Sequence, residues 1–583
     1  MVGPKPNEIV QAEQLMNESK TEEALEIVRE FQQSAWPYFF KRESNKALEI
    51  TEQSKELMEK IGEEIDLANN FFLMGYIYLQ KGNLNESLKY GMESVKIHEK
   101  INNRDGLESS LSLVGNIHWY IGNFIEALEY CERSLTYSKN DIRIKASNLR
   151  VLGNIHLIRG ELTQALKYSE EGMKLANEGK YQDLITSFRC YLGNAYKFMG
   201  EYIRAIEYLN PNLIETKISF PFQDVYKGIA LFTLITIYHE MGDDKMSHYY
   251  LDQFEEFAKE KENKDIRNFY FVAKGILLLN ESSRTRDRAE AEKLFKKVVE
   301  DAISVLPLYL YALWGLICTY IEELGISNDL EILEDINPLI DRYLSLAYRI
   351  KSSIMVCEVH VFKSKLALVQ LNFDEAKLLL TQAQQIAESH NLGWQAHRIS
   401  NYHDELLEQQ DRWNYLKNTN APISERIEIA SFDGILNQIQ GKRLEESIVL
   451  IHEEPVLLLI ITKGGFLIFS YPFTDEWKHD TEIFGSFLSA FTSFSDEFFS
   501  KGLDRAKFGE DTLLMQSVGN YSIGYLYKGQ SYPAKQKLTT FTKEIQDNTS
   551  IWQNFEKFVK TSQVAQVKDL PQIKNLINDI FNV

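Results

Sequence analysis

A chain of 583 residues is too long for one ordinary hydrophobic core, so it predicts several domains or an array of repeats. Its composition, 44% hydrophobic and 25% charged with only 12 prolines, is typical of a folded protein rich in helices. The formal net charge of −20 argues against binding to nucleic acid or to an anionic membrane surface, because both require clustered Lys and Arg.

The sequence indicates a cytoplasmic protein. Its first residues lack the apolar stretch of a signal peptide. The longest apolar runs, such as Pro455 to Ile461, are far too short to span a bilayer. The four cysteines lie far apart among apolar residues without a C-x-x-C pair, which predicts small core side chains in a reducing compartment: Cys131, Cys190, Cys318 and Cys357.

A pattern of about 40 residues recurs along the first half of the chain. Its clearest copies begin at Leu73, Leu113, Val151 and Tyr191, and a fifth begins at Leu234. A marker position follows two residues into most copies and is occupied by Gly75, Gly115, Gly153, Gly193 and Ile235. A period of this length predicts a stack of helix pairs that bury a common core.

Each position of the pattern has a physical purpose. The marker glycine costs about 1 kcal/mol of helix propensity, so it predicts that a neighbouring helix crosses closely there. An aromatic residue or histidine follows three residues later and fills the space between helices: Tyr78, His118, His156, Tyr196 and Tyr238. A second glycine ends the first helix as a C-cap: Gly82, Gly122, Gly160, Gly200 and Gly242. A small residue five positions later allows the second helix to pack closely: Ser87, Ala127, Ala165, Ala205 and Ser247.

The small–aromatic–small pattern resembles the tetratricopeptide repeat (TPR). Its period is similar to the long variant of kinesin light chains, bacterial Rap-type peptide receptors and the Leu-Gly-Asn-rich adaptors of G-protein signalling. The resemblance implies a mainly α fold, an α-solenoid of antiparallel helix pairs over residues 1–420. The clearest repeats span 68–258, and degenerate ones are expected at 20–67 and 259–415. Residues 44–62 and 373–391 each read as the second helix of a weaker repeat.

The resemblance also implies that the first helices line a concave groove. The candidate peptide-binding residues lie on these helices, at the position after each marker and one turn to either side: Phe72, Tyr76, Ser112, Asn116, Trp119, Arg150, Asn154, Asn194 and Lys197. An amide can donate to and accept from a peptide backbone, so the repeated asparagines favour binding of a peptide or helical segment with acidic and apolar character. The alternative is that these asparagines only hold adjacent helices together.

After about residue 420 the pattern changes from helical to mixed. A helix is expected over 425–446, a β-hairpin over 455–473, a helix over 481–500, and strands over 503–508, 511–518 and 521–527. Helices over 532–546 and 550–561 follow, and a short amphipathic helix ends the chain. This order resembles the roadblock/longin class of profilin-like modules, a small α+β domain with a five-stranded antiparallel sheet at 421–583. A PAS-like sensor is the alternative, because it also has five strands.

The expected helix at 481–500 carries no charge from Ile483 to Ser495. Opposite its phenylalanine stripe it has only small residues, which allow another chain to approach: Gly485, Ser489, Thr492 and Ser493. The roadblock resemblance implies dimerisation or docking through this helix. The alternative is that the chain's own repeats or tail cover it.

No enzyme signature occurs: the phosphate-binding, nucleophile-elbow, zinc-protease and dinucleotide motifs are all missing. His390, His397 and His403 lack a cysteine or second helix of ligands, so no metal site and no cofactor is expected. We therefore expect a non-catalytic scaffold or adaptor with a protein or peptide partner. The resemblances imply a possible homodimer and a small GTPase or its regulator as partner. The alternative is a signal-sensing TPR protein whose C-terminal module is a PAS-like sensor or regulatory domain.

Overall fold

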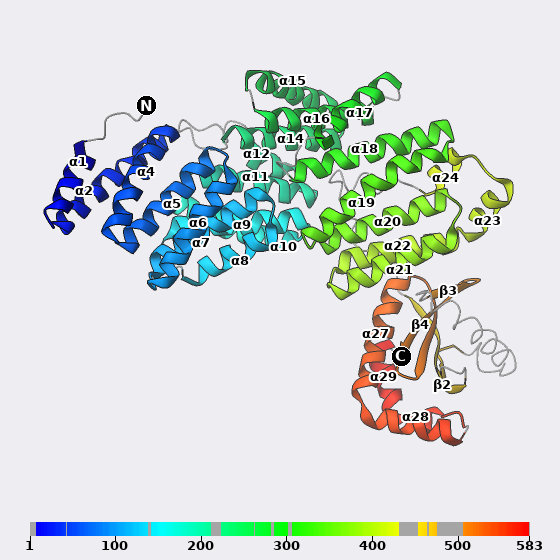
Figure 1. Ribbon diagram of the computed structural model, residues 1–583. Helices are drawn as coiled ribbons and strands as arrows, with labels where there is room; N and C mark the ends of the chain where they lie inside the picture. The colour runs from blue at the N-terminus through cyan, green and yellow to red at the C-terminus, as the bar shows by residue number, and fades with distance from the viewer. Residues whose placement is uncertain are drawn as a thin grey trace. The chain divides into compact units, whose positions relative to one another are not determined.

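The computed structural model describes residues 7–41, 43–137, 141–210, 223–261, 263–281, 285–300, 306–430, 453–462, 466–474, 505–561 and 563–581 (Figure 1). These residues divide into two units. One unit holds the described residues up to Ile321 together with 349–351, and the other holds 322–348 and the described residues from 352 onward. The change in composition near residue 420 lies inside the second unit.

The first unit is built from α-helices that follow one another as antiparallel pairs (Figure 1). Its helices are α1 Asn7–Asn17, α2 Thr21–Gln33, α3 Ala35–Phe40, α4 Ser44–Ile61, α5 Glu64–Gln80, α6 Leu84–Lys100, α7 Arg104–Ile121, α8 Phe124–Tyr137, α9 Ile142–Arg159, α10 Leu162–Glu178, α11 Gln182–Phe198, α12 Tyr202–Leu209, α14 Gln223–Glu240, α15 Asp244–Glu260, α16 Lys264–Glu281, α17 Thr285–Glu300 and most of α18 Leu306–Ser327.

The expected ends of the repeat helices are confirmed. The five second glycines adopt a left-handed backbone, with φ between +74° at Gly82 and +84° at Gly122. A side chain is strained in that region, which explains why glycine recurs there. Several helices also begin at a residue whose side chain caps the backbone, such as Asn103 before α7 and Asp141 before α9.

The expected close packing within each repeat is also confirmed. A Cβ at Gly115 would lie 2.6 Å from the sulfur of Cys131 on the partner helix. In another repeat the Ser87 hydroxyl donates to the Gly75 carbonyl at 2.8 Å. The aromatic position stacks on an aromatic residue of the second helix in all five copies, with ring centroids 5.3–5.5 Å apart: Tyr78–Tyr90, His118–Tyr130, His156–Tyr168, Tyr196–Tyr208 and Tyr238–Tyr250.

The fold is therefore a TPR-like solenoid, as predicted. The second helices expected at 44–62 and 373–391 are present as α4 and as α21 Phe373–Ser389. All four cysteines are buried. Burial raises the pKa of the Cys131 thiol to about 12, so this core thiol stays protonated at neutral pH.

The second unit continues the helices and ends in a small α+β module (Figure 1). Its remaining helices are α19 Leu333–Arg349, which follows the short η1 Leu330–Ile332, α20 Ser353–Val369, α22 Gly393–Glu408, α23 Gln410–Thr419 and α24 Ile423–Ala430. The module contains β1 Glu454–Thr462, β2 Leu467–Pro472, β3 Arg505–Phe508, β4 Asp511–Val518 and β5 Tyr521–Lys528. It closes with α27 Ser531–Asp547, α28 Thr549–Thr561, η4 Val567–Asp569 and α29 Pro571–Phe581.

The five strands form one antiparallel sheet in the order β2-β1-β5-β4-β3. The expected hairpin, the three later strands and the two helices after them are confirmed. The amphipathic tail helix α29 packs on the sheet through Ile573, Ile577 and Phe581, and the Phe581 ring lies 4.9 Å from that of Tyr525.

Two expectations for this module lie outside the described residues. Of the helix expected over 425–446, the structure describes only residues 425–430, which belong to α24. The expected interface helix, with Gly485, Ser489, Thr492 and Ser493, falls in 475–504, which the structure does not describe.

Candidate functional site

The candidate groove residues lie on the consecutive first helices α5, α7, α9 and α11. At the N-terminal end, Phe72 and Tyr76 of α5 are half-buried and meet edge to face, with ring centroids 5.0 Å apart. Phe39 of α3 lies 6.2 Å from the Tyr76 ring and 5.5 Å from Phe40, which is 71% exposed. Aromatic side chains from two helices thus gather around Tyr76.

Asn116 and Arg150 are both buried and join α7 to α9. The Asn116 amide donates to the Ser112 carbonyl at 2.7 Å and to the Ser147 hydroxyl at 3.3 Å. Its carbonyl oxygen accepts a hydrogen bond from the Arg150 guanidinium. Ser112 is itself buried. The hydrogen-bonding groups of Asn116 therefore point to its own helix and to the next first helix.

Trp119 and Asn154 make a second connection between the same helices. The Trp119 indole N–H donates to Asn154 Oδ1 at 2.8 Å. The Arg150 guanidinium lies over the Trp119 ring, 5.0 Å from its centroid, in a cation–π geometry. Arg150 also donates to the Tyr191 hydroxyl of α11 at 3.5 Å. One guanidinium thus touches residues of three successive first helices.

The same arrangement recurs between α11 and α14. Asn194 donates to the Cys190 carbonyl at 2.9 Å and accepts from the Thr233 hydroxyl at 3.1 Å. The Lys197 ammonium is almost fully buried, donates to Thr236 at 2.9 Å and pairs with Glu240 at 3.2 Å. Burial is the largest single effect on the pKa of Lys197 and lowers it, but the charge and hydrogen bond of Glu240 and the nearby Tyr311 together outweigh burial, so the pKa is raised.

These contacts give the two interpretations of the asparagines different weight at different positions. Asn116 and Asn194 use their amides to connect neighbouring helices, as the structural alternative expects. Asn154 receives a hydrogen bond from Trp119 and also lines a pocket. Asn154 thus lines the pocket together with Trp119 although it is only 7% exposed, whereas the half-buried Asn194 is the most accessible of the three asparagines.

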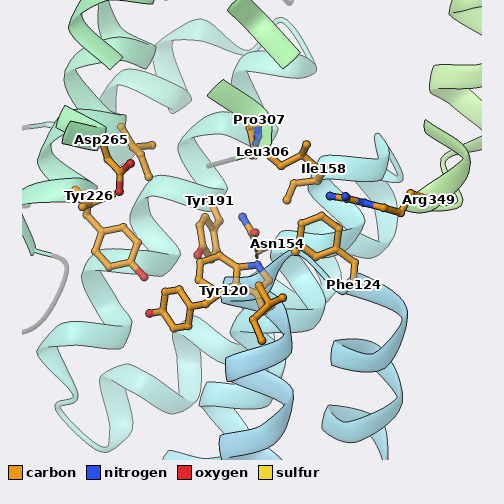
Figure 2. Close-up of a pocket in the computed structure, with 15 residues that line it drawn as sticks. Tyr120, Phe124, Asn154, Ile158, Tyr191, Tyr226, Asp265, Leu306, Pro307 and Arg349 are labelled. Atoms are coloured by element: carbon orange, nitrogen blue, oxygen red, sulfur yellow. Dashed lines mark hydrogen bonds between the residues drawn. The ribbon is translucent and has the colours of Figure 1, made fainter. Parts of the chain in front are cut away.

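The pocket lies within the first unit and has a volume of about 280 Å³ (Figure 2). Its lining is Trp119, Tyr120, Ile121, Gly122, Phe124, Asn154, Ile158, Tyr191, Val225, Tyr226, Ile229, Asp265, Leu306, Pro307 and Arg349. Aromatic and aliphatic walls with a few polar groups are typical of ligand sites. Figure 2 shows the hydroxyls of Tyr120, Tyr191 and Tyr226 directed toward one another.

Sequence reasoning missed these three tyrosines. Tyr120 follows the candidate residue Trp119, and Tyr191 lies two residues before the marker Gly193. Tyr226 comes from α14, where Ile235 replaces the marker glycine. Burial raises the pKa of Tyr120 and raises that of Tyr191 well above the ordinary value for tyrosine. Their phenols therefore stay protonated and remain hydrogen-bond donors at neutral pH.

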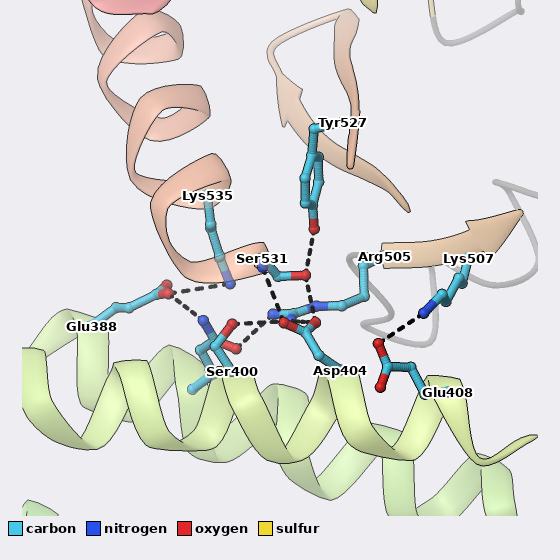
Figure 3. A network of polar contacts seen from close by, with 10 residues as sticks. Glu388, Ser400, Asp404, Glu408, Arg505, Lys507, Tyr527, Ser531 and Lys535 are labelled. Carbon is cyan, nitrogen blue, oxygen red and sulfur yellow. Dashed lines mark hydrogen bonds and ion pairs between the residues drawn. The ribbon is translucent and has the colours of Figure 1, made fainter. Parts of the chain in front are cut away.

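A second polar cluster lies within the second unit, where α21 and α22 meet β3 and α27 (Figure 3). Arg505 of β3 is buried and donates to Gln384 at 2.6 Å, to Ser400 at 3.2 Å and to Asp404 at 3.2 Å. Asp404 also accepts from the Ser531 backbone at 3.0 Å and hydroxyl at 2.5 Å.

Two partly exposed ion pairs lie beside this cluster. Lys507 pairs with Glu408 at 3.1 Å, and Lys535 pairs with Glu388 at 3.3 Å. Because the central charges of Arg505 and Asp404 neutralise each other, this cluster joins the helices to the module and leaves no charge unmatched at its centre. We therefore take the pocket of the first unit as the candidate binding site.

The histidines singled out in the sequence do not converge. His390 is exposed, His403 is buried, and the His397 ring packs against Tyr532 with centroids 5.2 Å apart. Within the described residues, no three His, Cys, Asp or Glu side chains are grouped so as to hold a metal ion. Within the same residues, no helix is both long and apolar enough to cross a membrane.

Comparison with known proteins supports the repeat assignment. Residues 66–140 match the tetratricopeptide repeat family. This TPR match spans α5 to α8 and so includes the candidate residues Phe72, Tyr76, Ser112, Asn116 and Trp119. No curated protein matches the sequence.

Three solved structures are similar to this chain at low identity. A Rap protein complexed with competence and sporulation factor has 13% identity and a TM-score of 0.32, covering 71% of this chain and 99% of that one. The TPR domain of P58(IPK) has 14% identity and a TM-score of 0.20, covering 66% and 99%. Naa15/Naa10 bound to HypK-THB has 11% identity and a TM-score of 0.16, covering 74% and 79%.

Proposed function

We propose that this protein is a non-catalytic interaction scaffold that binds a peptide or helical segment of a partner protein in the groove of its TPR-like repeats. The observation that carries the proposal is the pocket of about 280 Å³, which Trp119 and Asn154 line. The repeat array would cover 1–420 and a distinct module 421–583.

The chemistry of the pocket suits a peptide. Its walls of Trp119, Tyr120 and Tyr226 bury apolar groups, while the Asn154 amide and the tyrosine hydroxyls supply donors and acceptors for a backbone or a polar side chain. The half-buried aromatic residues around Tyr76, with the exposed Phe40, extend this surface along the groove. A few fixed polar groups within an aromatic wall can orient a bound ligand, and this task requires neither a nucleophile nor a general base.

Site-specific photo-crosslinking tests the proposal. The full chain carries p-benzoylphenylalanine in place of the half-buried pocket residue Ile121, and a matched control carries it in place of the exposed Lys167 on the outer helix α10. A partner should crosslink at Ile121 and not at Lys167. The additional change Ile229→Trp fills the pocket and should abolish the crosslink while the melting temperature stays unchanged. Equal crosslinking at both positions, or capture that survives Ile229→Trp, would contradict the proposal.

The C-terminal module serves, in the same proposal, for dimerisation or for docking to a small GTPase or its regulator. Its five-stranded antiparallel sheet, followed by α27 and α28, supports a roadblock/longin-like interpretation. A PAS-like sensor is the second candidate, and the segment that distinguishes the two lies in 475–504. Sedimentation of the full chain tests pairing: replacing Ser489 by Arg should convert a dimer into a monomer, and a monomer already in the unmodified chain would exclude dimerisation.

A further inference from the structure

Arg150 is a buried cation that has no carboxylate partner among the described residues. Arg150 lies on α9 and contacts residues of α7 and α11, and only 5% of its surface is exposed. Its hydrogen bonds go to the amide oxygen of Asn116 and the hydroxyl of Tyr191, and its face lies over Trp119. All three of these groups are neutral.

The other buried cation of the groove is matched differently. Lys197 has Glu240 at 3.2 Å, so the charge of that pair cancels. A buried charge without a counter-charge is costly, because it loses hydration and gains no Coulomb attraction in return. The Arg150 charge is thus the one an entering anion would neutralise.

The pocket places hydrogen-bond donors next to this charge. Tyr226, Tyr191 and Tyr120 lie close enough to Arg150 to interact with its charge electrostatically, and all three line the pocket. A guanidinium can only donate, so a hydroxyl that accepts from it keeps its own proton for another acceptor. Tyr191 is in this position and is hydrogen-bonded to the Tyr226 hydroxyl, which is directed toward it (Figure 2). An entering acceptor would therefore accept a hydrogen bond from this pair of hydroxyls.

The remaining charges of the pocket do not fill this role. Asp265 and Arg349 also line it and have opposite signs, so together they leave the pocket's charge unchanged. The protein as a whole carries −20, so it repels anions at long range. A preference for an anion must therefore come from the local charge of Arg150 and its surrounding hydroxyls.

We propose that this pocket binds a carboxylate of the partner peptide, held by the hydroxyls of Tyr191 and Tyr226 next to the charge of Arg150. This inference rests on the proposed function, since it names the chemistry of the peptide group that the pocket recognises. A carboxylate carries a single negative charge and matches the single cation. A phosphate group carries about −1.5 to −2 at neutral pH and would be left partly uncompensated.

Libraries of hexapeptides provide a probe that needs no known ligand. In each library one position is fixed as Glu or as Gln, and the C-terminus is either free or amidated. We expect the full chain to retain one carboxylate-bearing form roughly tenfold better than its neutral counterpart, as charge-assisted hydrogen bonds provide. Selection of Glu over Gln identifies an acidic side chain, and selection of the free over the amidated terminus identifies the peptide end.

Variants test which residues cause the preference. Arg150→Gln should remove it, and Tyr191→Phe with Tyr226→Phe should reduce it at least threefold while the aromatic walls remain. Arg143→Gln is the matched control, because it removes one cation from the same helix but Arg143 is exposed and already paired with Asp183. The control should retain the full preference.

The outcomes separate this inference from the proposed function. If library peptides carrying a photo-crosslinker at one end label the pocket but show no dependence on Glu or on the free terminus, the carboxylate inference is wrong and peptide binding stands. If no peptide labels the pocket, the proposed function is wrong. If Arg150→Gln fails to fold, the tyrosine double variant decides, and an unchanged preference in it overturns the inference.

Discussion

The ion pair between Arg505 and Asp404 should hold the C-terminal module against α22, and Asp404→Asn tests this with almost no change in shape. The Arg505 side chain is fully buried and that of Asp404 is 22% exposed. The asparagine amide removes the negative charge and turns one acceptor oxygen into a donor. That donor would face either Arg505 or the Ser531 backbone N–H, which are donors themselves.

The cost follows from the burial of the remaining cation. Removing one partner of a buried pair typically costs about 3–5 kcal/mol, because the other charge stays buried and unmatched. Arg505 retains Gln384 and Ser400 as acceptors, so we expect the lower end, about 3 kcal/mol. This corresponds to a factor of roughly 100 in the local opening equilibrium.

Native-state hydrogen exchange of the full chain measures this factor directly. Amides of β3 and the first turn of α27 should lose about a hundredfold protection in Asp404→Asn. Glu408→Gln is the control, since the Glu408 side chain is 63% exposed and its pair with Lys507 should contribute at most about 1 kcal/mol. Protection in Asp404→Asn that matches this control would refute the reasoning.

Three further predictions concern the repeats. Burial lowers the pKa of His98 and His118 in the folded chain, so at about pH 6 the unfolded chain binds more protons than the folded one. Stability should therefore fall as the pH drops below about 6.5. The melting temperature should decrease from pH 7 to 5.5, and it should decrease less in His118→Phe, which keeps the stacking on Tyr130. Gly115→Ala should destabilise the repeats by about 1–3 kcal/mol in urea unfolding, because the new methyl overlaps the Cys131 sulfur, and adding Cys131→Ala should restore most of the loss. Asp141→Ala should cost about 1 kcal/mol by the same measurement, since the Asp141 carboxylate accepts from the first N–H groups of α9; no loss would mean that solvent caps this helix equally well.

Much of the fold could be predicted because the determining contacts are local. Gly115 meets Cys131 sixteen residues later, and each aromatic position stacks on a residue twelve positions on, within the same helix pair. Strand alternation around single turns likewise predicted the hairpin of β1 and β2. Such contacts depend on a spacing that the sequence itself displays.

The details of the candidate site depend on pairings between repeats. Lys197 meets Glu240 one full period later, a relation that aligning the repeats column by column could have suggested. Arg150 gives no such signal, because what distinguishes it is that no carboxylate among the described residues contacts it. The contact of Arg505 with Asp404 joins residues 101 positions apart in different types of structure, and no periodic pattern relates them.

The chain of bonds from Asn116 through Arg150 to Tyr191 has a mechanical consequence. Since one guanidinium connects three successive first helices, bending the solenoid there requires that these bonds stretch or break together. The next repeat is connected in the same way through Lys197 and Thr236. The curvature of this stretch is thus set before any partner arrives, and a partner should be selected by how well its own backbone follows that curve.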